Sequence, residues 1–116
     1  MIDVEVWVRG RQDASTERIT GIEDDAAAWT DDDVKTLIEG MLLALQRSKD
    51  PAGEPPPITL RGFSWIVSPA DEGGVLLHVE MQLGTVSAGP FVIAEDRLTE
   101  MVSRVIGGPK ASTLVH

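Results

Sequence analysis

Residues 22–45, "IEDDAAAWTDDDVKTLIEGMLLAL", carry the clearest helix signal in the chain. The apolar residues recur at intervals of three and four, which is the spacing of one face of an α-helix. These residues are Val34, Leu37, Ile38, Met41, Leu42 and Leu45. We expect the helix to end near Ser48, because Pro51 cannot continue a helix and disfavours the helical conformation of the residue before it.

The acidic residues at the start of this stretch have a structural explanation in part. Thr30 is the predicted N-cap, which places residues 31–33, three aspartates, in the first turn. Free backbone N–H groups and the positive end of the helix dipole favour each anion there by ~0.3–1 kcal/mol. Trp29 and Val34 have the spacing of a hydrophobic staple across the cap. Capping does not explain the three earlier acids, which we interpret as an acidic surface for a partner: Glu23, Asp24 and Asp25.

The N-terminal residues alternate in the manner of a half-buried strand. Apolar side chains fall on one face and mostly polar ones on the other: Ile2, Val4, Val6 and Val8 against Asp3, Glu5, Trp7 and Arg9. Such a period of two is typical of a strand with one buried face. Residues 17–22, "ERITGI", are weaker in pattern but are compatible with a short strand that returns as a hairpin.

A second hairpin is predicted in the middle of the chain. Residues 50–57, "DPAGEPPP", indicate a stiff loop that leads into a strand over residues 58–69, "ITLRGFSWIVSP". "ADEGG" then forms a turn, and residues 75–86, "VLLHVEMQLGTV", are expected to form one return strand. Its two faces would carry Val75, Leu77, Val79, Met81 and Leu83 on one side and His78, Glu80 and Gln82 on the other.

The chain is predicted to close with a second amphipathic helix. Its apolar stripe is Leu98, Met101, Val102 and Val105, and Gly107, Gly108 and Pro109 should end it. Its start is left open, because Pro90 suits the first helical position while "FVI" suits an extended segment. We therefore expect a single α+β domain over residues 1–109, with 110–116 as a flexible tail. Its architecture would be a two-layer sandwich, in which two helices cover one face of an antiparallel sheet of three or four strands.

Composition narrows the classes of function. Ten basic and nineteen acidic residues give a net charge of −9, which opposes binding to nucleic acid and to anionic membranes. The absence of cysteine excludes disulfides, thiolate metal sites and a cysteine nucleophile. The N-terminus lacks the pattern of a secretory signal, and no apolar stretch approaches the ~20 residues of a membrane span, so we expect a cytoplasmic protein.

The face of the sheet that the helices leave uncovered is the candidate binding surface. Two registers are possible for residues 58–67. One buries Ile58, Leu60 and Ile66 under the helices and exposes Phe63 and Trp65, and the other does the reverse. We predict apolar anchors with a charged rim, as in many protein interfaces. The candidates are Trp7, Phe63 and Trp65 as anchors, and Arg9, Arg61, His78 and Glu80 as rim.

No residue pattern indicates catalysis or a bound cofactor. His78 and Glu80 share a strand face, but a third metal ligand is not evident. Residues 23–25 lack the spacing of a calcium loop, and no serine lies in a nucleophile motif. The sequence therefore predicts a non-catalytic interaction or assembly module, a homodimer or higher homo-oligomer formed through the open face or a strand edge. The alternative is an acidic inhibitor or adaptor, immunity-like or mimicking nucleic acid, that docks a basic protein. A small-molecule or metal-binding enzyme domain ranks third.

Overall fold

The fold was analysed in a computed structural model that describes residues 2–49, 63–71, 73–82 and 84–115, with side chains as far as residue 106. Its strands are β1 (Ile2–Val8), β2 (Ser15–Ile19), β3 (Ser64–Pro69), β4 (Val75–Met81) and β5 (Gly84–Phe91). Its helices are a short 3-10 turn, η1 (Ala26–Ala28), then α1 (Asp31–Lys49) and α2 (Glu95–Val115).

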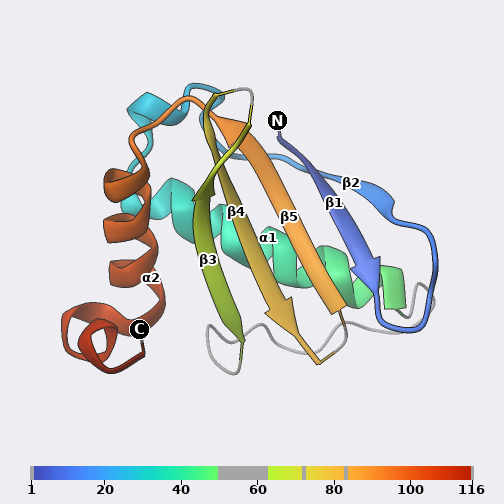
Figure 1. Cartoon of the computed structure of the whole chain (residues 1–116). Helices are drawn as coiled ribbons and strands as arrows, with labels where there is room; N and C mark the ends of the chain where they lie inside the picture. The colour runs from blue at the N-terminus through green and yellow to red at the C-terminus, as the bar shows by residue number, and fades with distance from the viewer. Residues whose placement is uncertain (1, 50–62, 72, 83, 116) are drawn as a thin grey trace.

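The strands form one antiparallel sheet in the order β2-β1-β5-β4-β3 (Figure 1). The predicted α+β class is confirmed, with five strands in place of the three or four expected. The last strand in sequence, β5, lies at the centre of the sheet, between β1 and β4. The order of the strands in space thus joins the N-terminal hairpin to the later one through β5.

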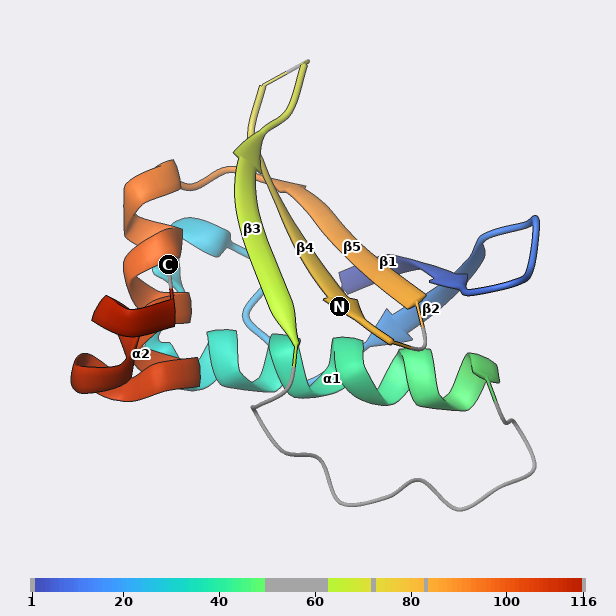
Figure 2. The ribbon, with the colours of Figure 1, turned by 60° about the horizontal axis from the view of Figure 1, so that its bottom comes forward.

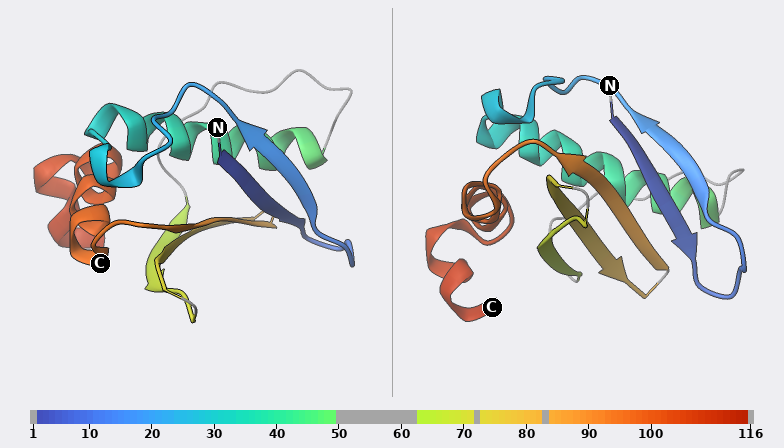
Figure 3. Two further views of the ribbon diagram at one scale, coloured as in Figure 1. Left: turned by 90° about the horizontal axis from the view of Figure 1, so that it is seen from above. Right: turned by 45° about the horizontal axis from the view of Figure 1, so that its top comes forward.

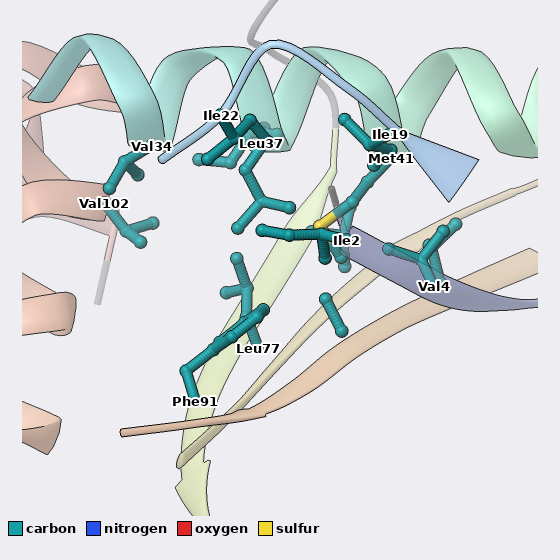
Figure 4. Packing of buried hydrophobic residues seen from close by; sticks show 14 of the residues in the cluster. Ile2, Val4, Ile19, Ile22, Val34, Leu37, Met41, Leu77, Phe91 and Val102 are labelled. Carbon is teal, nitrogen blue, oxygen red and sulfur yellow. The ribbon is translucent and has the colours of Figure 1, made fainter. Parts of the chain in front are cut away.

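One long helix supplies the second layer. The helix α1 lies along one side of the sheet, and α2 packs against α1 and β3 (Figures 2 and 3). Figure 4 shows the side chains of Leu37 and Met41 pointing from α1 toward the sheet, and that of Val34 beside Val102 of α2. The predicted apolar stripe of α1 is buried throughout, as is the predicted inner face of β1. Hydrophobic burial between these layers is the main stabilisation of the fold.

The start of α1 has the predicted cap. The Thr30 backbone N–H donates to Asp33 Oδ2 at 2.9 Å, and the Asp33 N–H donates back to Thr30 Oγ1 at 3.4 Å. The hydrogen bond from the Thr30 backbone, more than any other contact, holds the pKa of Asp33 below its usual value. Asp31 accepts two hydrogen bonds from Arg104 of α2, at 2.9 and 3.0 Å, and these lower the pKa of Asp31. The acidic first turn therefore both caps α1 and ties it to α2.

Two predicted elements differ from the structure. The run "VLLHVEMQLGTV" is two strands, because β4 ends at Met81, β5 begins at Gly84, and these two residues pair across the hairpin. Continuous apolar alternation hid this reversal, and the glycine at position 84 was its only sign in the sequence. In the structure Gly84 has a φ of +154°, which favours glycine. In addition, α2 continues past Gly107 and Pro109 to Val115. The prediction that the helix ends at these residues is therefore wrong. The ribbon of α2 instead changes direction in its C-terminal half (Figure 1).

Candidate functional site

The candidate site is the face of the sheet opposite α1, which we call the open face. Strand register fixes which side chains share it. Glu5 of β1 pairs with Ser87 of β5, Ser87 pairs with His78 of β4, and His78 pairs with Ile66 of β3. The next row along the strands is formed by Trp7, Thr85, Glu80 and Ser64. Four strands therefore contribute side chains to one continuous surface.

A trough runs along the open face because its central strand carries small residues. The floor, on β5, is formed by Thr85, Ser87 and Gly89, whereas the flanking strands carry larger side chains that form two walls. One wall, on β1, is Asp3, Glu5 and Trp7, and the other, on β4, is Leu76, His78 and Glu80. A hollow of about 360 Å³ lies between Trp7, Leu76 and the floor residue Ser87. A second hollow, of about 310 Å³, lies between His78 and Ile66.

Two large apolar side chains of the open face are in contact with solvent. Trp7 is 39% exposed and Ile66 is 59% exposed. Among the described residues, the third exposed large apolar side chain is Val92, which follows β5 and lines neither hollow. Trp7 lines the first hollow and Ile66 lines the second, and exposed apolar groups beside depressions are typical of a binding surface.

Some polar side chains of the open face have partners within the protein, and others have none among the described residues. His78 lies over the floor, with its Nδ1 atom 2.7 Å from Ser87 Oγ. Asp3 accepts a hydrogen bond from Arg18 of β2 at 3.0 Å, and both side chains are more than half exposed. In contrast, within the described residues Glu5 and Glu80 have neither an ion pair nor a side-chain hydrogen bond. The walls of the trough thus carry two carboxylates, Glu5 and Glu80, that no described basic side chain neutralises.

The contact between Ser87 and His78 does not by itself form a nucleophilic site. An activated serine needs a base that a third group orients, and donors that bind the developing oxyanion. In the described part of the chain, His78 has no carboxylate hydrogen-bonded to its ring. The backbone around Ser87 lies between two paired strands, which use its hydrogen-bonding groups. The contact orients the imidazole, but the described residues around Ser87 supply no donor for a tetrahedral intermediate.

The structure places some of the predicted interface residues on the open face. Trp7, His78 and Glu80 lie there, as expected. Arg9 follows β1 and, with Glu80 and Phe63, lines a further depression of about 430 Å³ at the end of the sheet where β1 and β4 finish. Arg61 lies outside the described residues.

Of the two registers that the sequence left open, the structure has the one that turns Trp65 toward the core and Ile66 outward. Trp65 pairs with Val79, whose side chain is fully buried beneath α1, so both face the core. Phe63 and Trp65 are partly buried and pack against the core cluster. The same register turns Ile66 outward. Ile66 was not among the anchors predicted from the sequence, because one of the two registers placed it in the core. Its pairing with the outward-facing His78 decides the side, and pairing is not visible in the sequence of one strand.

Two residues of the predicted acidic surface, Glu23 and Asp25, take part in local hydrogen bonds. Asp25 caps the turn η1 by accepting a hydrogen bond from the Ala27 N–H at 3.1 Å. The Glu23 carbonyl accepts a hydrogen bond from Nε1 of the buried Trp29 at 2.6 Å. Asp24 is exposed and also has an interaction partner. Among the described residues, no three potential ligands gather in a manner that would hold a metal ion.

Comparison with known proteins gives no relative. No family model matches the chain, and neither a curated protein nor a solved structure resembles it significantly. Within the described residues, neither helix has the length and apolar character needed to cross a membrane.

Proposed function

We propose that this protein is a non-catalytic interaction module that binds another protein chain through the open face of its sheet. The observation that carries the proposal is the exposure of Trp7 and Ile66 on the side that α1 leaves uncovered. Aromatic and aliphatic anchors beside a depression are the groups that typically supply most of the binding energy at an interface. A cytoplasmic setting is part of the proposal and is supported by the absence of cysteine.

The open face is a better candidate than either edge of the sheet. The edge strand β2 has only five residues, and its Glu17 and Arg18 are ion-paired to Arg47 and Asp3. The other edge strand, β3, ends at Pro69, and α2 packs against it. Short, charged or covered edges are the features by which proteins prevent strand pairing with another chain.

Two kinds of partner fit this face. The first is a second copy of the chain, because symmetric homo-oligomers are the common outcome for an exposed apolar surface. The second is a basic protein, and the unneutralised Glu5 and Glu80 on the walls of the trough favour it. Two copies that met through this face would bring these carboxylates together, at a net charge of −9 for each chain.

The experiment that tests the proposal is a measurement of molar mass by size-exclusion chromatography with light scattering, at low and high salt. It compares the wild type with Trp7→Ser/Ile66→Ser, and the control is Val92→Ser, which removes an exposed apolar group outside the trough. A salt-insensitive dimer that only the double variant abolishes would support self-association. A wild-type monomer would exclude self-association and leave the basic partner. A dimer that survives the double variant would contradict self-association through the open face.

A further inference from the structure

We infer that the trough beside Trp7 receives a cationic side chain, an arginine or a lysine, from a basic protein partner. This inference rests on the proposed function and specifies the chemistry of the partner. It follows from three properties of the hollow between β1 and β4, namely its shape, its charge and the aromatic ring at its side.

The shape of the hollow suits a long, narrow side chain. Its floor is low because Ser87 has a small side chain and Gly89 has none. Trp7 and Leu76 supply apolar surface on opposite walls. An aliphatic stem can lie along such walls while its polar head stays at the rim, as arginine and lysine side chains commonly do.

The charge of the hollow selects a cation. Its lining includes the carboxylates of Asp3 and Glu5 but neither an arginine nor a lysine among the described residues. Glu5 is exposed and has no ion pair in the described part of the chain, so its carboxylate is available to a partner. Asp3 is held by Arg18, an exposed pair of the kind that contributes little to stability. A phosphate or carboxylate would meet repulsion from the Glu5 carboxylate, which forms no ion pair among the described residues.

The aromatic ring adds a second source of attraction for a cation. Trp7 follows Glu5 by two residues on the same strand, so the indole and the carboxylate project from the same side of β1. Tryptophan is the aromatic side chain whose face attracts cations best, and guanidinium groups also stack on it. A guanidinium at the rim can therefore contact the indole and the Glu5 carboxylate together.

The chain itself is a poor source of the cation. It has ten basic residues against nineteen acidic ones, and Arg18, Arg47, Arg97 and Arg104 are already engaged in contacts within the protein. A second copy would also add its own unneutralised acids to the interface. A separate basic protein satisfies the charge of the trough without this repulsion.

The test is an NMR titration with a defined probe, the peptide amide Gly-Arg-Gly-Arg-Gly, and its twin in which uncharged citrulline replaces both arginines. Arginine at alternate positions matches the alternation of an extended chain. We expect saturable shifts of the Trp7 indole N–H and of the Glu5 and Ser87 amides with the arginine peptide. The citrulline peptide should bind at least about fivefold more weakly, since it cannot form the charged contacts.

Matched variants separate a specific site from a general effect of net charge. Glu5→Gln should raise the Kd of the arginine peptide about fivefold. Glu100→Gln, which removes the same charge from the exposed surface of α2, should leave the Kd nearly unchanged. Equal weakening by both variants would mean that only the overall field attracts the peptide, and it would overturn the inference.

Failure of the inference can be told apart from failure of the proposed function. If both peptides bind equally and shift the same open-face amides, the inference is overturned and the proposed function stands. If neither peptide shifts these amides, the inference is also overturned. The proposed function falls with it if the chain is in addition monomeric at all salt concentrations.

Discussion

The two tryptophans Trp7 and Trp29 should respond very differently to truncation. Trp29 is 2% exposed, donates its indole N–H to the Glu23 carbonyl at 2.6 Å, and packs edge to face on Phe91 with 4.7 Å between the ring centroids. Trp7 is 39% exposed, and its side chain lies on the open face. Trp29→Ala therefore removes core packing, whereas Trp7→Ala removes a surface group.

The magnitudes follow from what each substitution removes. Burial of a tryptophan side chain covers roughly 150–250 Å², which at about 25 cal/mol per Å² corresponds to about 4–6 kcal/mol as an upper bound. Truncation of core tryptophans to alanine typically costs about 3–5 kcal/mol, and we expect a loss in this range for Trp29→Ala. Trp7→Ala should cost about 1–2 kcal/mol, because Trp7 is 39% exposed and its contacts are cross-strand contacts on the sheet surface. Trp29→Phe keeps a ring against Phe91 but loses the indole hydrogen bond, so about 1–2 kcal/mol is expected.

Urea unfolding followed by far-ultraviolet circular dichroism measures all three variants. The free energy of unfolding of such a domain is commonly about 5–15 kcal/mol, so Trp29→Ala can leave too little stability to measure. Trp29→Phe is the variant that remains interpretable in that case. A loss above about 3 kcal/mol for Trp7→Ala would place Trp7 in the core and refute the open-face argument. A loss below about 1 kcal/mol for Trp29→Ala would refute the packing of Trp29 on Phe91.

Three further predictions concern the fold. The hydrogen bond from the Thr30 backbone lowers the pKa of Asp33 from 3.8, so the unfolded chain binds more protons in acid than the folded chain. The stability that Asp33 contributes is therefore fully present above pH 3.8 and is lost as the pH falls through the folded pKa. Asp33→Asn should therefore flatten the acid side of a plot of urea midpoint against pH, and an unaltered slope would contradict this. Arg104→Ala should lower the melting temperature slightly, and less at high salt, because its pair with Asp31 is half exposed; a salt-independent loss would show that packing, not charge, is removed. Gly84→Ala should destabilise by more than about 2 kcal/mol in urea unfolding, since its Cβ would overlap the Trp7 carbonyl oxygen, and a neutral effect would contradict the hairpin geometry.

Part of the candidate site was predictable from the chain alone. The alternation around Trp7 placed it opposite the buried valines of β1, and the same pattern placed His78 and Glu80 opposite Val79. In each case one face of the strand is uniformly apolar, so only one orientation buries it. Residues 63–67 have apolar groups on both faces, and for them the pattern could not choose.

The trough itself was beyond prediction from sequence. It depends on Ser87 and Gly89 lying between β1 and β4, and β5 was not recognised as a strand. These residues are small and lack the branched or aromatic character that indicates a strand. They became a floor only because strands distant in sequence pair on both sides of them.

The sequence by itself determined the local elements with strong periodicity. It specified the stripe and cap of α1, the inner face of β1 and the surplus of negative charge, because these depend on residues near one another in the chain. The tertiary structure alone decided that Ile66 faces outward, that Trp65 packs on the core and that Glu5 and Trp7 flank a hollow. Each of these depends on which strands pair and in what register, and pairing is set by the burial of the whole sheet against α1 rather than by the pattern of any single strand.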